Sequence, residues 1–155
     1  MNDKRSLQDI YAPKSICFGC GPLNENGLKI KSYKYNNGLR MSFHPKKEHQ
    51  AFPGVLNGGI IGTLFDCHGN WTAAMSIFES NNQKQFPATV TAFFEVQLLK
   101  PTPVDTKIEI FSQIITSSKN KAKVELELFS NNDICAKSVG VFVSVKEGHP
   151  AFYRW

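Results

Sequence analysis

The pattern of apolar and polar positions predicts one long helix in the middle of the chain. Residues 57–80 contain no proline, and Asn57 is placed to cap the first turn. Apolar residues recur there at helical spacing, at Ile60, Ile61, Leu64, Phe65, Trp71, Met75 and Phe78. The two asparagines at 81–82 end the pattern, so the helix is expected to stop there.

Strand patterns flank this helix on both sides. Before it, alternation over 28–35, a turn at 36–38 and renewed alternation over 39–43 predict a β-hairpin, and 44–56 is expected to be a loop. After it, alternation predicts four strands: 88–98, 107–116, 121–129 and 134–145. One sheet and one long apolar helix imply that the sheet curls around the helix to bury it, in the order β-β-α-β-β-β-β.

The strand over 88–98 separates two faces of different character. One face is expected to consist of Ala88, Val90, Ala92, Phe94, Val96 and Leu98. The other face is expected to carry Thr89, Thr91, Glu95 and Gln97. The alternation therefore predicts that Thr91 and Phe94 lie on opposite sides of the sheet.

The composition indicates one globular domain. The chain has 155 residues, of which 41% are hydrophobic and 20% charged, enough for a core. We expect a turn-rich N-terminal segment over 1–27 and a single domain over 28–155. No run approaches the roughly 20 apolar residues that span a bilayer, and the first residues lead into no signal region. We therefore expect a cytoplasmic protein without a membrane partner, whose cysteines are thiols.

The net charge of +5 is compatible with a ligand that carries phosphate. The basic residues are scattered, and the densest cluster, over 119–123, predicts a solvated hairpin turn. No basic stripe interleaved with aromatic residues is present, so we expect no nucleic-acid partner.

Candidate chemistry lies at the start of the predicted helix. Gly58 and Gly59 open it, where backbone N–H groups lack helical partners and carry partial positive charge. Glycine lets a ligand approach this backbone closely. Such an amide suits a carbonyl oxygen that becomes negative during a reaction. Asp66 follows two turns later among Ile, Leu and Phe, where an acid needs a specific role.

Asp66 is predicted to share one face of the helix with small residues. Those residues are Gly59, Gly62, Gly69, Asn70 and Ala73. A carboxylate on such a face predicts a catalytic group. The alternative is a carboxylate that bonds a hydroxyl or a backbone amide at a dimer contact.

Two segments together suggest a family. Residues 52–59 (Phe-Pro-Gly-Val-Leu-Asn-Gly-Gly) followed by Asp66, and residues 17–22 (Cys-Phe-Gly-Cys-Gly-Pro) followed by Asn26-Gly27-Leu28, resemble hotdog-fold thioesterases of the phenylacetate-pathway (PaaI-like) group. The resemblance runs from Cys17 to Val145. It implies an α+β hotdog fold, in which an antiparallel curved sheet wraps one central helix. It also implies a homodimer or homotetramer with active sites between subunits, an acyl-CoA substrate and no cofactor.

The resemblance also implies roles for individual residues. The Gly59 N–H would bind the thioester carbonyl, and Asp66 of the other subunit would be the general base or nucleophile. Thr91 would hold the water. Asn57 stands where the family usually has histidine, and it can cap the helix and donate a hydrogen bond but cannot exchange protons near neutral pH.

Four further residues are candidates for substrate binding: Gly58, His49, Gln50 and Phe52. An asparagine that the family places slightly earlier falls on Ala51, and Gln50 or His49 could replace it. A solvated loop position is an equal alternative for His49.

Two other functions remain open. Asn57 motivates a non-catalytic protein that binds acyl-CoA or lipid. Hydration or dehydration of an enoyl or hydroxyacyl thioester is the second alternative, and Asn57 argues against it because that chemistry usually wants an acid–base histidine there.

The remaining histidine and cysteine candidates favour structural roles. His68 is expected in the core or an interface, since two residues along a helix turn it away from Asp66. Cys17 and Cys20 have the spacing of half a zinc site, but no second close pair follows, so a packed turn is predicted and no metal. Cys67 is expected in the core.

Overall fold

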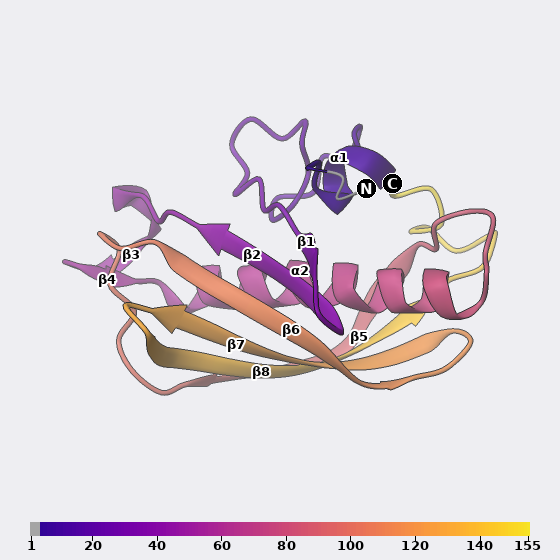
Figure 1. Cartoon of the computed structure of the whole chain (residues 1–155). Coiled ribbons are helices and arrows are strands. Elements are labelled where there is room, and N and C mark those ends of the chain that lie inside the picture. Colours follow the sequence, from indigo (N-terminus) through magenta and orange to yellow (C-terminus); the bar gives the residue numbers. More distant parts are fainter. Residues whose placement is uncertain (1–3) are drawn as a thin grey trace.

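A computed structural model describes residues 4–155 and shows a sheet that curves around one long helix (Figure 1). The helices are α1 (Leu7–Tyr11) and α2 (Gly58–Ser80), and a 3₁₀ turn spans Lys47–His49. The main sheet contains β1 (Tyr33–Tyr35), β2 (Gly38–Phe43), β5 (Thr89–Leu98), β6 (Ile108–Ser117), β7 (Lys121–Ser130) and β8 (Asp133–Ser144). Two short strands, β3 (Gln50–Phe52) and β4 (Val55–Leu56), form a separate hairpin.

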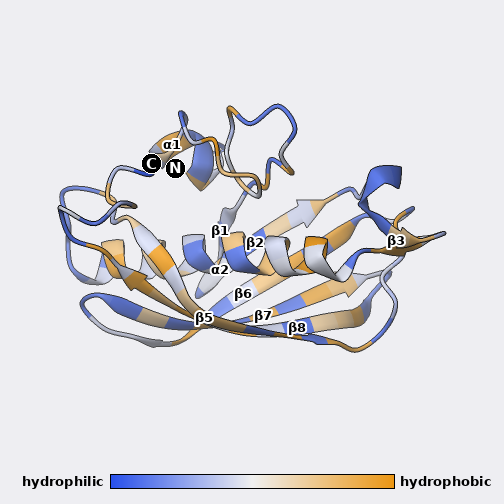
Figure 2. Cartoon of the chain, turned by 180° about the vertical axis from the view of Figure 1, so that it is seen from behind, coloured by the Kyte–Doolittle hydropathy of each residue, from blue (hydrophilic) through white to orange (hydrophobic). Residues whose placement is uncertain are grey.

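The main sheet is antiparallel throughout, with strand order β1-β2-β6-β7-β8-β5. Strands β1 and β5 are therefore its edges. Helix α2 lies between this sheet and a layer that holds α1 and the C-terminal end of the chain, as Figures 1 and 2 both show. The predicted α+β fold, one curved antiparallel sheet around one central helix, is confirmed.

Helix α2 begins and ends where the pattern predicts. Asn57 has extended backbone angles (φ −63°, ψ 132°), and its side chain caps the helix by accepting the Gly59 N–H. Leu64, Phe65 and Trp71 are 0% exposed. A helix that is apolar on most sides must be covered on most sides, and the sheet and the α1 layer together do so.

The alternation predicted for the strand over 121–129 is confirmed in β7, where exposed or partly exposed residues alternate with buried ones. The buried residues are Ala122, Val124, Leu126 and Leu128, and they lie on the side of the sheet that faces the core. Deleting such buried side chains in other proteins costs several kcal/mol, because a cavity remains.

The predicted first strand of the hairpin is shorter than expected. Only Tyr33–Tyr35 pairs with β2. Over 28–32 burial does alternate, but the backbone bonds the N-terminal segment instead of the sheet: Leu28 N–H donates to the Phe18 carbonyl and Ile30 N–H to the Gly19 carbonyl. Alternation reports which side chains are buried, and a loop can bury them as a strand does. The predicted loop over 44–56 likewise contains the 3₁₀ turn and the β3–β4 hairpin.

The predicted faces of β5 are wrong for its first half. The pairing of β5 with β8 shifts register between Thr91 and Phe93, which is a β-bulge. One extra residue moves the following side chains to the opposite face. Thr91 and Phe94 therefore both face α2, where Thr91 bonds Asp66 and Phe94 approaches Gly62.

A buried polar chain ties α1 to the core. The Gln8 amide donates to Ser32 Oγ (3.0 Å) and accepts the Ser32 N–H (2.8 Å). Ser32 Oγ lies 2.8 Å from His68 Nδ1, and Ser112 Oγ lies 3.3 Å from His68 Nε2. Gln8 and His68 are fully buried. The first described residues thus contribute to the same core as α2 and β6.

Gln8→Leu is expected to lower the free energy of unfolding by about 1–3 kcal/mol, because it leaves the buried Ser32 N–H without an acceptor and removes one hydrogen bond to Ser32 Oγ. Urea denaturation followed by circular dichroism measures this change. Gln85→Leu is the matched control: Gln85 is exposed, so its change should stay within about 0.5 kcal/mol. Equal midpoints for the two variants would contradict a structural role for the buried chain.

Candidate active site

Asp66 lies on the face of α2 that meets the edge strand β5. Thr91 Oγ1 donates a hydrogen bond to Asp66 Oδ1 over 2.5 Å. Asp66 is half-buried, and this burial raises its pKa above the ordinary value, while the Thr91 hydrogen bond and the Arg154 charge act in the opposite direction. A carboxylate with a raised pKa and one fixed donor is a stronger base than a solvated one.

The start of α2 is exposed, but its Gly59 amide is already in use. Asn57 Oδ1 accepts the Gly59 N–H over 2.7 Å, while Asn57 and Gly59 are both exposed. A ligand oxygen can reach this N–H only if the Asn57 side chain turns away. The cap therefore competes with the oxyanion role that the resemblance implies for Gly59.

Gly59 and Asp66 are too far apart to act on one carbonyl within a single chain. Seven residues of α-helix separate them by about 10 Å along the axis. Asp66 faces β5, where it bonds Thr91, and Gly59 is exposed at the start of the helix. A site that uses both groups needs a second chain.

The start of α2 and strand β5 meet in a region that we call the α2–β5 junction, made by Gly58, Gly62, Asp66, Phe94 and Leu98. A Cβ on Gly58 would lie 3.1 Å from Leu98 Cδ1, and one on Gly62 would lie 3.9 Å from Phe94 Cε2. Phe94 is 40% exposed and Leu98 58%. The junction therefore offers apolar surface next to Asp66.

The predicted stripe of small residues divides into two parts. Gly62 and Asp66 are at the junction, but a Cβ on Gly69 would lie 2.7 Å from Phe142 Cζ, so this part packs against the sheet. Asn70 is buried and bonds Thr89, and Ala73 is fully buried. Only the first half of the stripe can face a ligand or a second chain.

The other predicted binding residues lie around the helix start. His49 lines a pocket of about 410 Å³ together with Phe18, Leu28 and Ile60. The Gln50 side chain is engaged in its own turn, since it donates to the Lys47 carbonyl and accepts the Gly54 N–H.

Phe52 is 61% exposed at the end of β3 and lines none of the pockets described here. Gly58 lies at the α2–β5 junction. His49, Gln50 and Phe52 therefore surround the start of α2 without forming one cavity with Asp66 in the single chain.

His68 is a core histidine, as the helical geometry predicts. Burial lowers its pKa to about 3, and its two ring nitrogens face serine hydroxyls. It is neutral at ordinary pH and enclosed, so it is unsuited to supply the acid–base histidine that Asn57 replaces.

Sequence reasoning missed two groups near Asp66. Arg154 donates to the Thr89 carbonyl over 2.7 Å, and its charge lowers the pKa of Asp66. Cys17 lies on the N-terminal segment and raises that pKa. The sequence marked Cys17 only through its spacing to Cys20, which gives no link to Asp66, and Arg154 follows β8 in a segment without a periodic pattern.

The structure brings Cys17, Cys20 and Cys67 together. Their sulfur atoms all lie within 4.8 Å of one another, and Cys67 is buried in α2 as predicted. Hydrogen bonds with Cys20 and Cys67 lower the pKa of Cys17, whereas the Cys17 contact raises the pKa of Cys20 to about 11 and also raises that of Cys67. One negative charge is therefore most easily held on Cys17.

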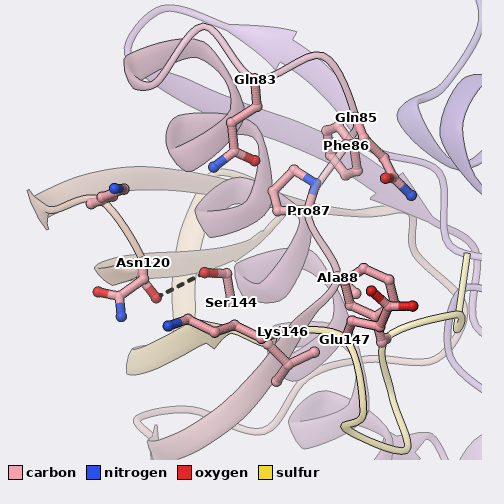
Figure 3. A pocket seen from close by; sticks show the side chains of 12 residues that line it. Gln83, Gln85, Phe86, Pro87, Ala88, Asn120, Ser144, Lys146 and Glu147 are labelled. Carbon is pink, nitrogen blue, oxygen red and sulfur yellow. Dashed lines mark hydrogen bonds between the residues drawn. The ribbon is translucent and has the colours of Figure 1, made fainter.

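A second pocket, of about 520 Å³, lies between the chain before β5 and the chain after β8 (Figure 3). Gln85, Phe86 and Ala88 line one side, and Lys146 and Glu147 line the other. None of the predicted site residues lines this pocket. The candidate chemistry is therefore placed at the α2–β5 junction and the helix start.

No protein-family model and no curated protein matches the sequence. A thioesterase superfamily protein from Shewanella loihica is 31% identical, and the match covers 90% of this chain and 100% of that one with a TM-score of 0.70. The E. coli PaaI protein from the phenylacetic acid degradation operon is 13% identical over 77% of this chain and 81% of that one (TM-score 0.65). A hypothetical thioesterase from Streptococcus pneumoniae, solved with coenzyme A, is 14% identical over 75% and 85% (TM-score 0.63). The last two matches show the same fold, and the first shows the family: this chain belongs to the thioesterase superfamily, with a PaaI-like hotdog fold.

Proposed function

We propose that this protein is an acyl-CoA thioesterase in which Asp66 acts as the general base or nucleophile. One observation carries the proposal. Asp66 is a half-buried carboxylate with a raised pKa, held by Thr91 at an exposed, partly apolar junction.

As a general base, Asp66 takes a proton from water while the water oxygen bonds to the thioester carbon. The carbonyl oxygen becomes negative and is held by the Gly59 N–H at the start of α2. The C–S bond then breaks, and the departing sulfur receives the proton from Asp66. The products are a carboxylic acid and the free thiol of CoA.

The proposed site is shared between two subunits. The separation of Gly59 from Asp66 by about 10 Å supports this arrangement, because one chain cannot bring both to one carbonyl. Strand β5 is an edge strand with Phe93 53% exposed, and its neighbour Phe94 is also open. An apolar strand edge of this kind is suited to pairing with a second copy. We therefore propose a homodimer, and a homotetramer remains a prediction.

Coenzyme A is the proposed thiol carrier of the substrate. The net charge of +5 favours a ligand that carries phosphate. The fold is shared with a hypothetical thioesterase that was solved with coenzyme A.

In the described part of the chain, no helix is long and apolar enough to cross a membrane.

The test is a panel of short, long and aromatic acyl-CoAs assayed with a thiol-trapping dye. We expect at least one to release free CoA far faster than the uncatalysed reaction. Failure of every member, with a folded protein of dimer mass, would contradict the thioesterase proposal.

A second candidate function is binding of acyl-CoA without hydrolysis. The Asn57 cap on the Gly59 N–H favours it, because the amide needed for the oxyanion is already paired. Thermal stabilisation by an acyl-CoA without release of free thiol over hours would identify this alternative.

Thr91→Val is expected to lower turnover by about 10–100-fold, since a hydrogen bond to a charged group is worth about 1.5–3 kcal/mol. Initial rates with the best acyl-CoA of the panel measure the loss. Thr116→Val is the matched control, because Thr116 is exposed on β6 and should leave the rate unchanged. A Thr91 variant as fast as this control would remove Thr91 from the mechanism.

A further inference from the structure

Three of the four cysteines meet beneath the N-terminal segment, although the sequence separates them. Cys17 and Cys20 come from the turn over 17–22, and Cys67 comes from α2. All three sulfur atoms lie within 4.8 Å of one another, and Cys17 Sγ lies 3.8 Å from Cys67 Sγ. No other group of three or more candidate ligands is found among residues 4–155.

This spacing matches the sulfur positions around one metal ion. A tetrahedral zinc ion with Zn–S bonds of about 2.3 Å holds its sulfur ligands about 3.8 Å apart. A disulfide needs about 2.05 Å between sulfur atoms. The Cys17 and Cys67 sulfurs thus have the separation of two ligands of a common ion, Cys20 Sγ lies within 4.8 Å of both, and none of the three cysteines is in a disulfide.

The surroundings hold these sulfurs in place. Trp71 Nε1 donates to Cys20 Sγ over 3.3 Å, and the Trp71 ring is fully buried. Such N–H donors to sulfur are the outer contacts that orient thiolate ligands around metals. A Cβ on Gly19 would lie 2.3 Å from Cys67 Sγ, so only glycine lets the turn close over Cys67.

We propose that Cys17, Cys20 and Cys67 bind one zinc ion through three thiolates, with water in the fourth position. Cys20 and Cys67 are buried and Cys17 is half-buried, so an ion and a water molecule would reach the group from the Cys17 side. Thiolate ligands favour zinc over hard cations such as magnesium and calcium. Each thiol loses its proton on binding.

The ion would fasten the N-terminal segment to α2 next to Asp66. Binding to the folded state alone stabilises it, by RT ln(1 + [L]/Kd). Zinc is therefore expected to raise the melting temperature and to protect residues 4–27 against limited proteolysis. Neither measurement needs an acyl-CoA, so a negative result would contradict the zinc site without contradicting the thioesterase proposal.

The experiment uses the full chain, stripped of metal with a chelator under reducing conditions. Titration with Co²⁺, a spectroscopic substitute for Zn²⁺, should produce a thiolate-to-cobalt absorption band that saturates at one ion per chain. Added Zn²⁺ should then bleach this band. Mass spectrometry under native conditions should show one zinc per chain.

Cys17→Ser is expected to abolish the cobalt band while the circular dichroism spectrum persists, because this side chain is half-exposed. Cys135→Ser is the matched control, since Cys135 is buried near Asp133 and lies outside the group of three. It should keep the full band.

Two outcomes of the cobalt titration would overturn the proposal. One is a wild-type chain without a stoichiometric cobalt band. The other is a band that survives in Cys17→Ser. A disulfide between Cys17 and either partner, found by mass spectrometry after mild oxidation in saturating Zn²⁺, would also contradict a site that is closed by metal.

Discussion

Asp66→Asn is expected to lower turnover of the best acyl-CoA substrate by about 10²–10⁴-fold, which is the range that general acid–base catalysis supplies. The substitution keeps the shape of the side chain, and Thr91 can still donate to its amide oxygen. What it removes is the ability to take a proton from water or to attack the carbonyl. Burial raises the pKa of Asp66, so the wild-type carboxylate is also a better base than a solvated one.

Initial rates with the thiol-trapping dye measure this loss, and urea unfolding verifies that the variant is folded. Asp105→Asn is the matched control, because Asp105 is exposed in the loop between β5 and β6. Turnover equal to that of the control with several acyl-CoAs would exclude Asp66 from the mechanism and favour the binding-only alternative.

Gly59→Pro is expected to lower turnover by about 10²–10³-fold, which is the usual cost of removing one oxyanion donor. Proline deletes the N–H and is tolerated in the first turn of a helix, where that N–H has no helical acceptor. In this chain the Gly59 N–H bonds only the Asn57 side chain, so its loss removes a cap bond and no helical bond.

Gly59→Ala separates the amide from the glycine itself. Alanine keeps the N–H, and its Cβ would meet only Asn57 Oδ1 at 2.9 Å. Its loss of turnover should therefore be smaller than that of the proline variant. Equal losses would show that space at the helix start, and not the N–H, is what the reaction requires.

Mixing the two inactive chains tests whether the site is shared between subunits. If Asp66 and Gly59 of one site come from different chains, a mixed dimer of Asp66→Asn and Gly59→Pro contains one intact site and one doubly changed site. Random exchange in a two-fold dimer should then restore about one quarter of wild-type turnover. No recovery, with exchange proven by mass, would contradict a site shared in this way.

The Asn57 side chain affects both the stability of α2 and access to the Gly59 N–H. As a cap it stabilises α2, and as an acceptor it occupies the amide that the reaction needs. The substrate carbonyl must displace it, which makes the helix start a site where binding and capping compete. An active wild-type enzyme would therefore imply that Asn57 rotates when substrate binds.

The sequence alone determined the fold class and the position of the reactive helix. Local periodicity predicted the order and the bounds of these elements: α2 begins one residue after Asn57, and β6, β7 and β8 lie close to their predicted ranges. Hydrophobic periodicity predicts these elements because each helix or strand must bury one face, and that face consists of residues at regular spacing in the sequence. Asp66 was found in the same way, as a charge inside an apolar helix.

The tertiary structure decided what depends on contacts between distant segments. The bulge in β5 put Phe94 on the same side of the sheet as Thr91, which bonds Asp66, and the N-terminal turn brought Cys17 and Cys20 to Cys67. A bulge changes the face of every later residue without altering the alternation before it. The contact between Cys17 Sγ and Cys67 Sγ at 3.8 Å joins residues far apart in the chain, so no periodic pattern in the sequence predicts it. The contact of Arg154 with the Thr89 carbonyl could not be predicted either, because the surface on which this segment packs determines its path.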